Sequence, residues 1–170
     1  MLSTTFTLSK PTLHAMLLPA LGCASLIMGA YIKVPFYPVP LTLQTFALLV
    51  IALTLPPRQA CYSACGYLLL ATLGFPVFYW HANPYWGIGK CAGYLWAFPI
   101  SVYWIAKMKS KIGYFFASAT GAVLIFTCGA LWLLPFVGLK AAWLKGFVCF
   151  IPCGLSKILL ALSLIKGRQK

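Results

Sequence analysis

Long apolar stretches separated by short polar or proline-containing segments run through almost the whole chain. An α-helix needs about 20 apolar residues to cross the hydrocarbon core of a bilayer, so this pattern predicts membrane-spanning helices. The six predicted spans cover residues 13–32, 41–55, 59–73, 91–106, 113–134 and 146–165. We therefore expect an all-α integral membrane protein in which a six-helix transmembrane domain (13–166) lies between a polar cytoplasmic leader (1–12) and a basic cytoplasmic tail (167–170).

Proline and glycine divide the pattern further. Pro19 is expected to break the first helix, and Pro152 with Gly154 the sixth. Residues 34–40 contain three prolines and predict an irregular or extended connection. Residues 74–89, rich in Gly, Pro, Trp and Tyr, predict a long ordered loop near a membrane interface.

Two other segments need separate interpretation. Residues 20–23 faintly resemble a lipoprotein cleavage site, but the preceding basic region is weak and further spans follow at once, so we interpret this stretch as a helix. Residues 136–145 predict a short interfacial segment that Trp143 anchors.

The composition identifies lipid as the main solvent. The 170 residues are 62% hydrophobic and 8% charged, whereas a soluble domain carries about 25% charged residues. All charge is positive, because 13 Lys and Arg stand against no Asp or Glu. These basic residues lie singly between apolar stretches, so we expect them to flank helices beside anionic lipid headgroups, and we do not expect nucleic acid as a partner.

The distribution of the basic residues predicts the orientation. With both termini inside, the inner segments hold Lys10, Arg58, Lys107, Lys109, Lys111, Lys166, Arg168 and Lys170. The outer segments then hold only Lys33, Lys90, Lys140 and Lys145. Because cytoplasmic loops are enriched in Lys and Arg, we expect a multi-pass protein of the cell membrane with both termini cytoplasmic.

The missing carboxylates exclude several functions. Paired-carboxylate hydrolysis, a carboxylate proton relay, an acid-ligated cation site and a Walker B acid all need Asp or Glu, and no Walker A pattern is present. The protein is therefore not expected to be an enzyme, and energy for any uphill transport would come from another subunit. The seven cysteines are interpreted as small apolar residues, and neither a metal nor a cofactor is expected.

Two lysines are candidates for binding an anion. Lys157 lies about halfway along the sixth predicted span, where a lysine costs roughly 2.5–3.5 kcal/mol on insertion scales. Its long side chain could instead reach the interface, and without an acid it needs backbone carbonyls, a neutral state or an anion from elsewhere. Lys90 stands at the outer start of the fourth helix, where free N–H groups attract anions, although an ordinary interfacial lysine fits equally well.

Other polar and small residues suggest supporting roles. Gln44 is a candidate buried amide at the start of the second helix, and Thr42 is expected to cap that helix. Ala20 and Ala24, with Gly22 between them, form a small-residue face on the first helix. This face suits close contact either within the bundle or with a partner subunit.

Residues 34–46, which read VPFYPVPLTLQTF, resemble a signature of the BioY family, the biotin-specific substrate-capture (S) components of energy-coupling factor (ECF) transporters. Weaker matches at 67–70, 74–78 and 93–95 follow in the family's order, so the resemblance covers residues 14–165. It implies a six-helix S-component bundle that binds biotin in a pocket open to the outside. It also implies that the Ala20 and Ala24 face docks onto a transmembrane ECF subunit, which two cytoplasmic ATPases drive.

The resemblance also implies a ligand set. Biotin is a carboxylate that Lys90 and Lys157 would bind, and Tyr94 belongs to the fourth-helix motif. That motif departs from the family pattern, because residues 89–95 read GKCAGYL and lack its Thr and one Gly. The family's last helix carries Gly-Asp-x-x-Lys, but residues 153–157 read CGLSK, so the biotin-contacting acid is absent.

Four groups could replace that acid as the acceptor for the ureido N–H: Ser156, Asn83, Gln44 or a backbone carbonyl. Two other functions remain open. The ligand could be another small anionic vitamin or precursor such as dethiobiotin, or the protein could be a structural or assembly membrane protein that transports nothing.

Overall fold

The computed structural model describes residues 10–78 and 85–168, and side chains in the first helix from Met16 onward. The elements in chain order are α1 (Lys10–Tyr31), β1 (Lys33–Val34), β2 (Leu41–Thr42), α2 (Gln44–Thr54), α3 (Pro57–Thr72), the 3₁₀ turn η1 (Trp86–Ile88), α4 (Ala92–Ile112), α5 (Tyr114–Val137), α6 (Leu139–Trp143), the π-helical turn η2 (Leu144–Val148) and α7 (Phe150–Arg168). The six predicted spans correspond to α1 to α5 and α7.

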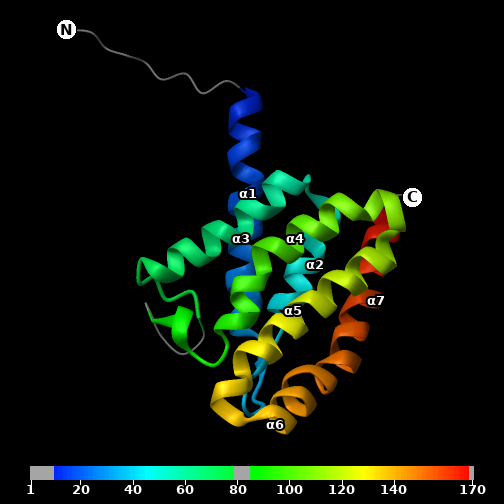
Figure 1. The fold of residues 1–170 in the computed structure, drawn as a ribbon. Coiled ribbons are helices and arrows are strands. Elements are labelled where there is room, and N and C mark those ends of the chain that lie inside the picture. The colour runs from blue at the N-terminus through cyan, green and yellow to red at the C-terminus, as the bar shows by residue number, and fades with distance from the viewer. Residues whose placement is uncertain (1–9, 79–84, 169–170) are drawn as a thin grey trace, which may run out of the picture.

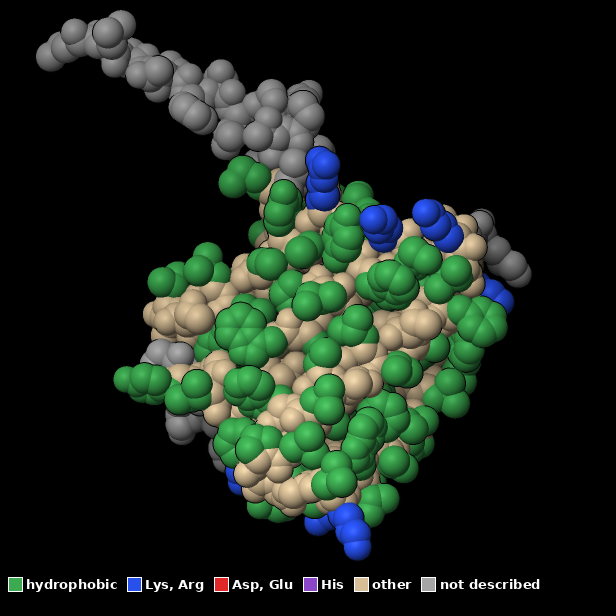
Figure 2. All heavy atoms as spheres, viewed as in Figure 1, with side chains coloured by type: hydrophobic (Ala, Val, Ile, Leu, Met, Phe, Trp, Pro, Cys, Tyr) green, Lys and Arg blue, Asp and Glu red, His purple; other side chains and the backbone are tan. Residues whose placement is uncertain are grey.

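The surface of the bundle suits a membrane. Figure 2 shows hydrophobic side chains across the middle of one face, with Lys and Arg side chains at its two ends. Large exposed apolar side chains include Trp96, Leu131 and Leu159. By length and apolar composition, α5 and the segment Leu139–Gly167 could each cross a membrane. Lipid contact on the outside explains this surface, because water would be a poor solvent for it.

The helices surround a space at one end of the molecule. α4 packs along α5 and α3, α1 packs on α2 and α3, and α7 packs on α2 and α5. The start of α1 and the end of α7 lie at one end of the bundle, and the β1–β2 hairpin and α6 lie at the other (Figure 1). The α4–α5 contact is close, because a side chain at Gly129 would overlap the ring of Tyr94.

The predicted helix breaks at proline are wrong. α1 continues through Pro19, and α7 runs from Phe150 through Pro152 and Gly154 without interruption. Pro152 lies in the first turn of α7, where a missing N–H removes no intrahelical hydrogen bond. Membrane helices also tolerate internal proline, because local adjustments and neighbouring groups compensate for the lost bond.

The connection after α1 is more regular than the prolines suggest. β1 and β2 form a short antiparallel hairpin in which Lys33 pairs with Thr42 and Val34 with Leu41. The predicted capping role of Thr42 is wrong, because Leu43 precedes α2 and no side chain caps the helix. The hairpin instead brings Lys33 and the carbonyl of Thr42 beside the first turn of α2.

The opposite end of α2 is capped by a lysine from another helix. α4 extends to Ile112, beyond the predicted end at residue 106. Lys109 Nζ donates hydrogen bonds to the carbonyl oxygens of Ala52 (3.1 Å), Leu53 (2.9 Å) and Leu55 (3.0 Å). A cation at the C-terminus of a helix satisfies carbonyls that lack intrahelical partners and complements the helix dipole. Lys109 is thus a structural cation that ties α4 to α2.

Candidate functional site

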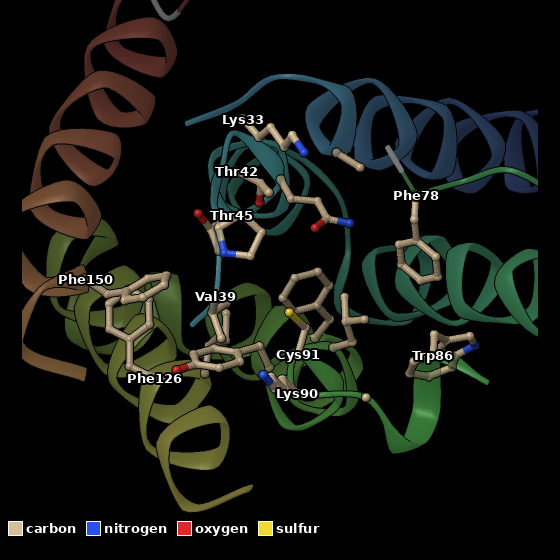
Figure 3. A pocket seen from close by; sticks show the side chains of 18 of the residues that line it. Lys33, Val39, Thr42, Thr45, Phe78, Trp86, Lys90, Cys91, Phe126 and Phe150 are labelled. Carbon is tan, nitrogen blue, oxygen red and sulfur yellow. The ribbon is translucent and has the colours of Figure 1, made fainter. Parts of the chain in front are cut away.

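A cavity of about 510 Å³ lies at the hairpin end of the bundle, within the usual size range of small-molecule sites. The hairpin, η1, α2, α4, α5 and α7 all contribute to its wall. Figure 3 shows Lys33, Thr42 and Thr45 on one side and Lys90 with Cys91 on the opposite side. Aromatic rings lie toward both ends of the view, so polar groups face a largely apolar space.

Lys157 reaches from α7 to the beginning of α2. Its Nζ donates hydrogen bonds to the Thr42 carbonyl oxygen (2.7 Å) and to Thr45 Oγ1 (2.8 Å), and the Cys153 thiol lies beside it. The N-terminus of a helix carries the positive end of its dipole, so an ammonium group there is unfavourably placed. An anion bound in the cavity would compensate for this arrangement.

Two further lysines line the cavity. Lys90, at the start of α4, is exposed, and its Nζ lies 5.2 Å from the centroid of the Tyr37 ring. Lys33 belongs to β1, and desolvation lowers the pKa of its ammonium group. Three lysines therefore contribute to the wall, while the sequence contains no carboxylate to neutralise them. This charge pattern selects for anions.

A buried amide forms another part of the polar wall. Gln44 is only 6% exposed, and its Nε2 donates a 2.5 Å hydrogen bond to the hydroxyl of Tyr67. Tyr67 is fully buried and meets Phe78 edge to face at 5.7 Å. With its NH₂ group oriented by Tyr67, Gln44 has an amide oxygen that can accept a hydrogen bond.

Aromatic side chains complete the wall. Tyr94 stacks on Phe150 at 5.6 Å, and its hydroxyl donates a 2.6 Å hydrogen bond to the Gly146 carbonyl. Phe126 lies 5.6 Å from Phe150, and Trp86 lies beside Phe78 on the other side of the cavity. These rings offer apolar contact area to the uncharged part of a ligand.

Gly154 leaves room for one of these rings. A Cβ atom at this position would lie 3.0 Å from Cε2 and Cζ of Phe126, which is tighter than ordinary van der Waals contact. The Phe126 ring therefore lies against the backbone of α7, three residues before Lys157. An aromatic ring therefore lies at the position where the resemblance implies a carboxylate.

Four of the predicted ligand-binding residues are brought together. Gln44, Lys90, Tyr94 and Lys157 all line the cavity, although they come from three different helices or helix ends. Ser156 is exposed and does not line it, because its Oγ donates back to the Cys153 carbonyl. Asn83 lies outside the described residues. The contact of these six residues with a ligand remains a prediction.

The two predicted docking residues share the outside of α1. Ala20 and Ala24 are both exposed, whereas Gly22 between them is buried against Ser63 of α3. Their exposure leaves the small-residue face accessible to another helix.

Sequence reasoning missed three parts of the wall. Lys33 was interpreted only as a flanking charge, and its place beside the cavity depends on the hairpin. Thr45, one residue after Gln44, meets Lys157 only because α7 packs against α2. Phe126 gave no signal, since one phenylalanine in an apolar span resembles any other.

Comparison with known proteins gives the same architecture. A solved structure described as the S-component for biotin from an ECF-type ABC transporter matches with a TM-score of 0.80 at 21% identity, over 96% of this chain and 95% of that one. The predicted S-component bundle is thereby confirmed.

Relatives found by sequence similarity point to the same family as the structural match. The "Probable biotin transporter BioY" of Pyrococcus horikoshii is 37% identical over 79% of this chain and 83% of its own length. The "Biotin transporter BioY" of Thermotoga maritima is 33% identical over 86% of this chain and 90% of its own. Residues 3–170 match the model of the BioY family. The proline-rich signature first indicated a resemblance to the BioY family, and the chain therefore belongs to that family.

Proposed function

We propose that this protein is the substrate-capture subunit of a vitamin importer, which binds biotin as its carboxylate anion and delivers it with energy from a partner ATPase module. The observation that carries this proposal is the cavity of about 510 Å³ with Lys33, Lys90 and Lys157 in its wall and no acid in the chain. The names of the relatives, biotin transporters, support the identity of the ligand.

The polar and apolar groups of biotin match the polar and apolar parts of the cavity wall. Its carboxylate is a partner for ammonium groups, and its ureido ring needs both donors and acceptors. Gln44 and Thr45 can supply these at the polar wall. Its thioether ring and aliphatic chain need apolar contacts, which the rings of Tyr94, Phe126 and Phe150 provide.

The cavity would face the outside of the cell. The positive-inside distribution favours cytoplasmic termini, and both ends of the described chain lie opposite the hairpin (Figure 1). A multi-pass protein in this orientation presents its cavity to the external medium. It would capture substrate there without a catalytic step of its own.

Docking on a transmembrane ECF subunit would use the exposed Ala20 and Ala24. Alanine spaced at i and i+4 permits close approach of a second helix, and bulky side chains would prevent it. The partner's ATPases would supply the energy that this chain has no motif to obtain.

A binding assay tests the ligand. Purified protein in nanodiscs should bind tritiated biotin saturably, and unlabelled biotin should compete more strongly than fatty acids of similar length. Absence of saturable binding in folded preparations would refute biotin capture.

A second assay tests the partner. The double variant Ala20→Leu and Ala24→Leu should bind biotin normally but lose co-purification with a co-expressed ECF module and lose uptake in cells. Substitution of the exposed Met28 by leucine, on the same helix, serves as the control. Normal module binding by the double variant would contradict the docking role.

The second candidate function is also substrate capture for an importer, but with a different ligand. No acidic side chain exists to accept a hydrogen bond from a ureido N–H, so another small carboxylate, such as a biotin precursor, fits the same charges. Competition with dethiobiotin and related carboxylates separates the two, since a clear preference for biotin over every analogue excludes the alternative.

A further inference from the structure

One exposed aromatic ring lies near two lysines, of which Lys90 lines the cavity. Tyr37, in the connection between β1 and β2, is 67% exposed. Lys90 Nζ lies 5.2 Å from its ring centroid and Lys145 Nζ lies 5.9 Å from it. Two like charges that share one ring repel each other, and no carboxylate in the sequence can separate them. The two ammonium groups, those of Lys90 and Lys145, thus repel each other without an anion of this chain to offset the repulsion.

Lys145 does not line the cavity, but its backbone turn is fixed by Tyr94, which does. It belongs to the π-helical turn η2, and the next residue, Gly146, accepts the hydrogen bond from the Tyr94 hydroxyl. A Cβ at Gly146 would lie 2.8 Å from that hydroxyl, so the turn fits closely against Tyr94. π-Helical turns often mark functional positions. The hairpin and the turn lie at the same end of the bundle (Figure 1).

We propose that Lys90 and Lys145 form an outer carboxylate-binding site at the cavity mouth, and that the Tyr37 ring occupies this site before the ligand arrives. The proposal rests on the proposed function, because it names the first contact of the carboxylate ligand. A charge-assisted hydrogen bond between a carboxylate and an ammonium group is stronger than a cation–π contact at an exposed position. The incoming anion therefore displaces the ring.

Lys90 gives the outer site a connection to the cavity. It contacts Tyr37 outside and also contributes to the cavity wall, so a carboxylate can move inward while it keeps one ammonium partner. Lys145 stays outside. Its charge should therefore accelerate association more than it strengthens the final complex, since exposed charges mainly steer encounter.

Stopped-flow measurement of tryptophan fluorescence tests this role, because Trp86 lines the cavity. At low salt, Lys145→Gln should lower the association rate constant for biotin about fivefold, with the dissociation rate constant changed less than twofold. Lys145→Arg should restore association. Lys140→Gln removes an exposed lysine of the neighbouring α6 and serves as the matched control.

Ligand charge provides the second control. Biotin amide has no carboxylate, so Lys145→Gln should leave its association rate unchanged. Equal association rates for Lys145→Gln and Lys140→Gln, or an equal loss for biotin and biotin amide, would overturn the outer site. Binding of biotin by the unmodified protein in the same experiment would leave the proposed function intact.

A probe without biotin tests the site independently. Fluorotyrosine at position 37 should give a ¹⁹F signal that acetate shifts saturably and acetamide does not. Lys145→Gln should abolish that shift. An unresponsive signal in the unmodified sequence background would refute the site even if biotin binding succeeds, and a response without biotin binding would refute only the proposed function.

Discussion

Two lysines at opposite ends of α2 have the same chemistry and different surroundings. Lys109 meets the C-terminal end, where three backbone carbonyls match its three N–H donors and the helix dipole attracts a cation. Lys157 meets the N-terminal end, where it has two oxygen acceptors and a thiol, and where the dipole repels it. The fold alone supplies favourable surroundings for Lys109, and we predict that Lys157 also contacts an external anion.

The two lysines thus differ in the helix end that they meet, and only Lys157 lines the cavity. Both ammonium groups are partly buried in a chain that contains no acid. Burial alone therefore does not distinguish the two lysines. What distinguishes Lys157 is the cavity beside it and the polarity of the helix end that it meets.

The largest expected effect is on ligand affinity when Lys157 is replaced. Lys157→Met keeps an unbranched side chain only one atom shorter and removes its charge, so the Kd for biotin should rise about 100-fold, or ~2.7 kcal/mol. Equilibrium binding of tritiated biotin in nanodiscs measures this change. Lys166→Met, on the same helix and exposed, should leave the Kd within twofold. An unchanged Kd in Lys157→Met would show that Lys157, like Lys109, does not bind the ligand.

Replacement of Lys109 should affect stability instead. Lys109→Met leaves three carbonyl oxygens at the end of α2 without their donor, which should cost about 2 kcal/mol and lower Tm by several degrees. A fluorescence-based thermal unfolding assay in detergent measures Tm. Biotin affinity of the folded variant should change less than threefold. A large loss of affinity at unchanged Tm would show that this lysine also serves the cavity.

A methyl group at position 154 should have an intermediate effect. Gly154→Ala places a Cβ against Phe126, so the ring must shift toward the cavity, and the Kd for biotin should rise roughly fivefold. Gly167→Ala adds the same methyl group to the same helix, at a position with open space around it, and should have no effect. Equal affinities for the two variants would mean that Phe126 does not shape the binding surface.

The smallest expected effect concerns the orientation of Gln44. Tyr67→Phe removes the hydroxyl that accepts the hydrogen bond from Gln44, so the amide loses its preferred orientation and the Kd should rise about threefold. Tyr62→Phe, on the exposed side of α3, is the matched control. A Kd equal to that of the control would show that the Tyr67 hydroxyl does not contribute to ligand binding and that the side chain serves only in packing.

The fold was largely predictable because lipid imposes a simple rule on the sequence. A span must be long and apolar, so the six helices follow from composition along the chain, and α1 to α5 and α7 lie where they were expected. The errors in the interiors of the helices came from proline. Its effect depends on the turn of the helix that it occupies, as Pro152 in the first turn of α7 illustrates.

The cavity was predictable only in part. Lys157 and Lys90 stood out because a lysine within or beside an apolar span is costly. Phe126 and Lys33 did not, because their roles depend on which neighbour they face. Ser156 shows the converse: it adjoins Lys157 in the sequence, but successive residues of a helix point in different directions, and its side chain is exposed.

By itself, the sequence determined that this is a helical membrane protein of the BioY pattern, without acids and with an excess of cations. These properties depend on composition and on local runs of residues, which do not change with the packing. Only the tertiary structure decided which lysine caps a helix end and which lies beside a cavity. The reason is that the energy of a charge depends on the atoms around it. Lys109 and Lys157 receive their oxygen acceptors from residues more than 50 and more than 110 positions away.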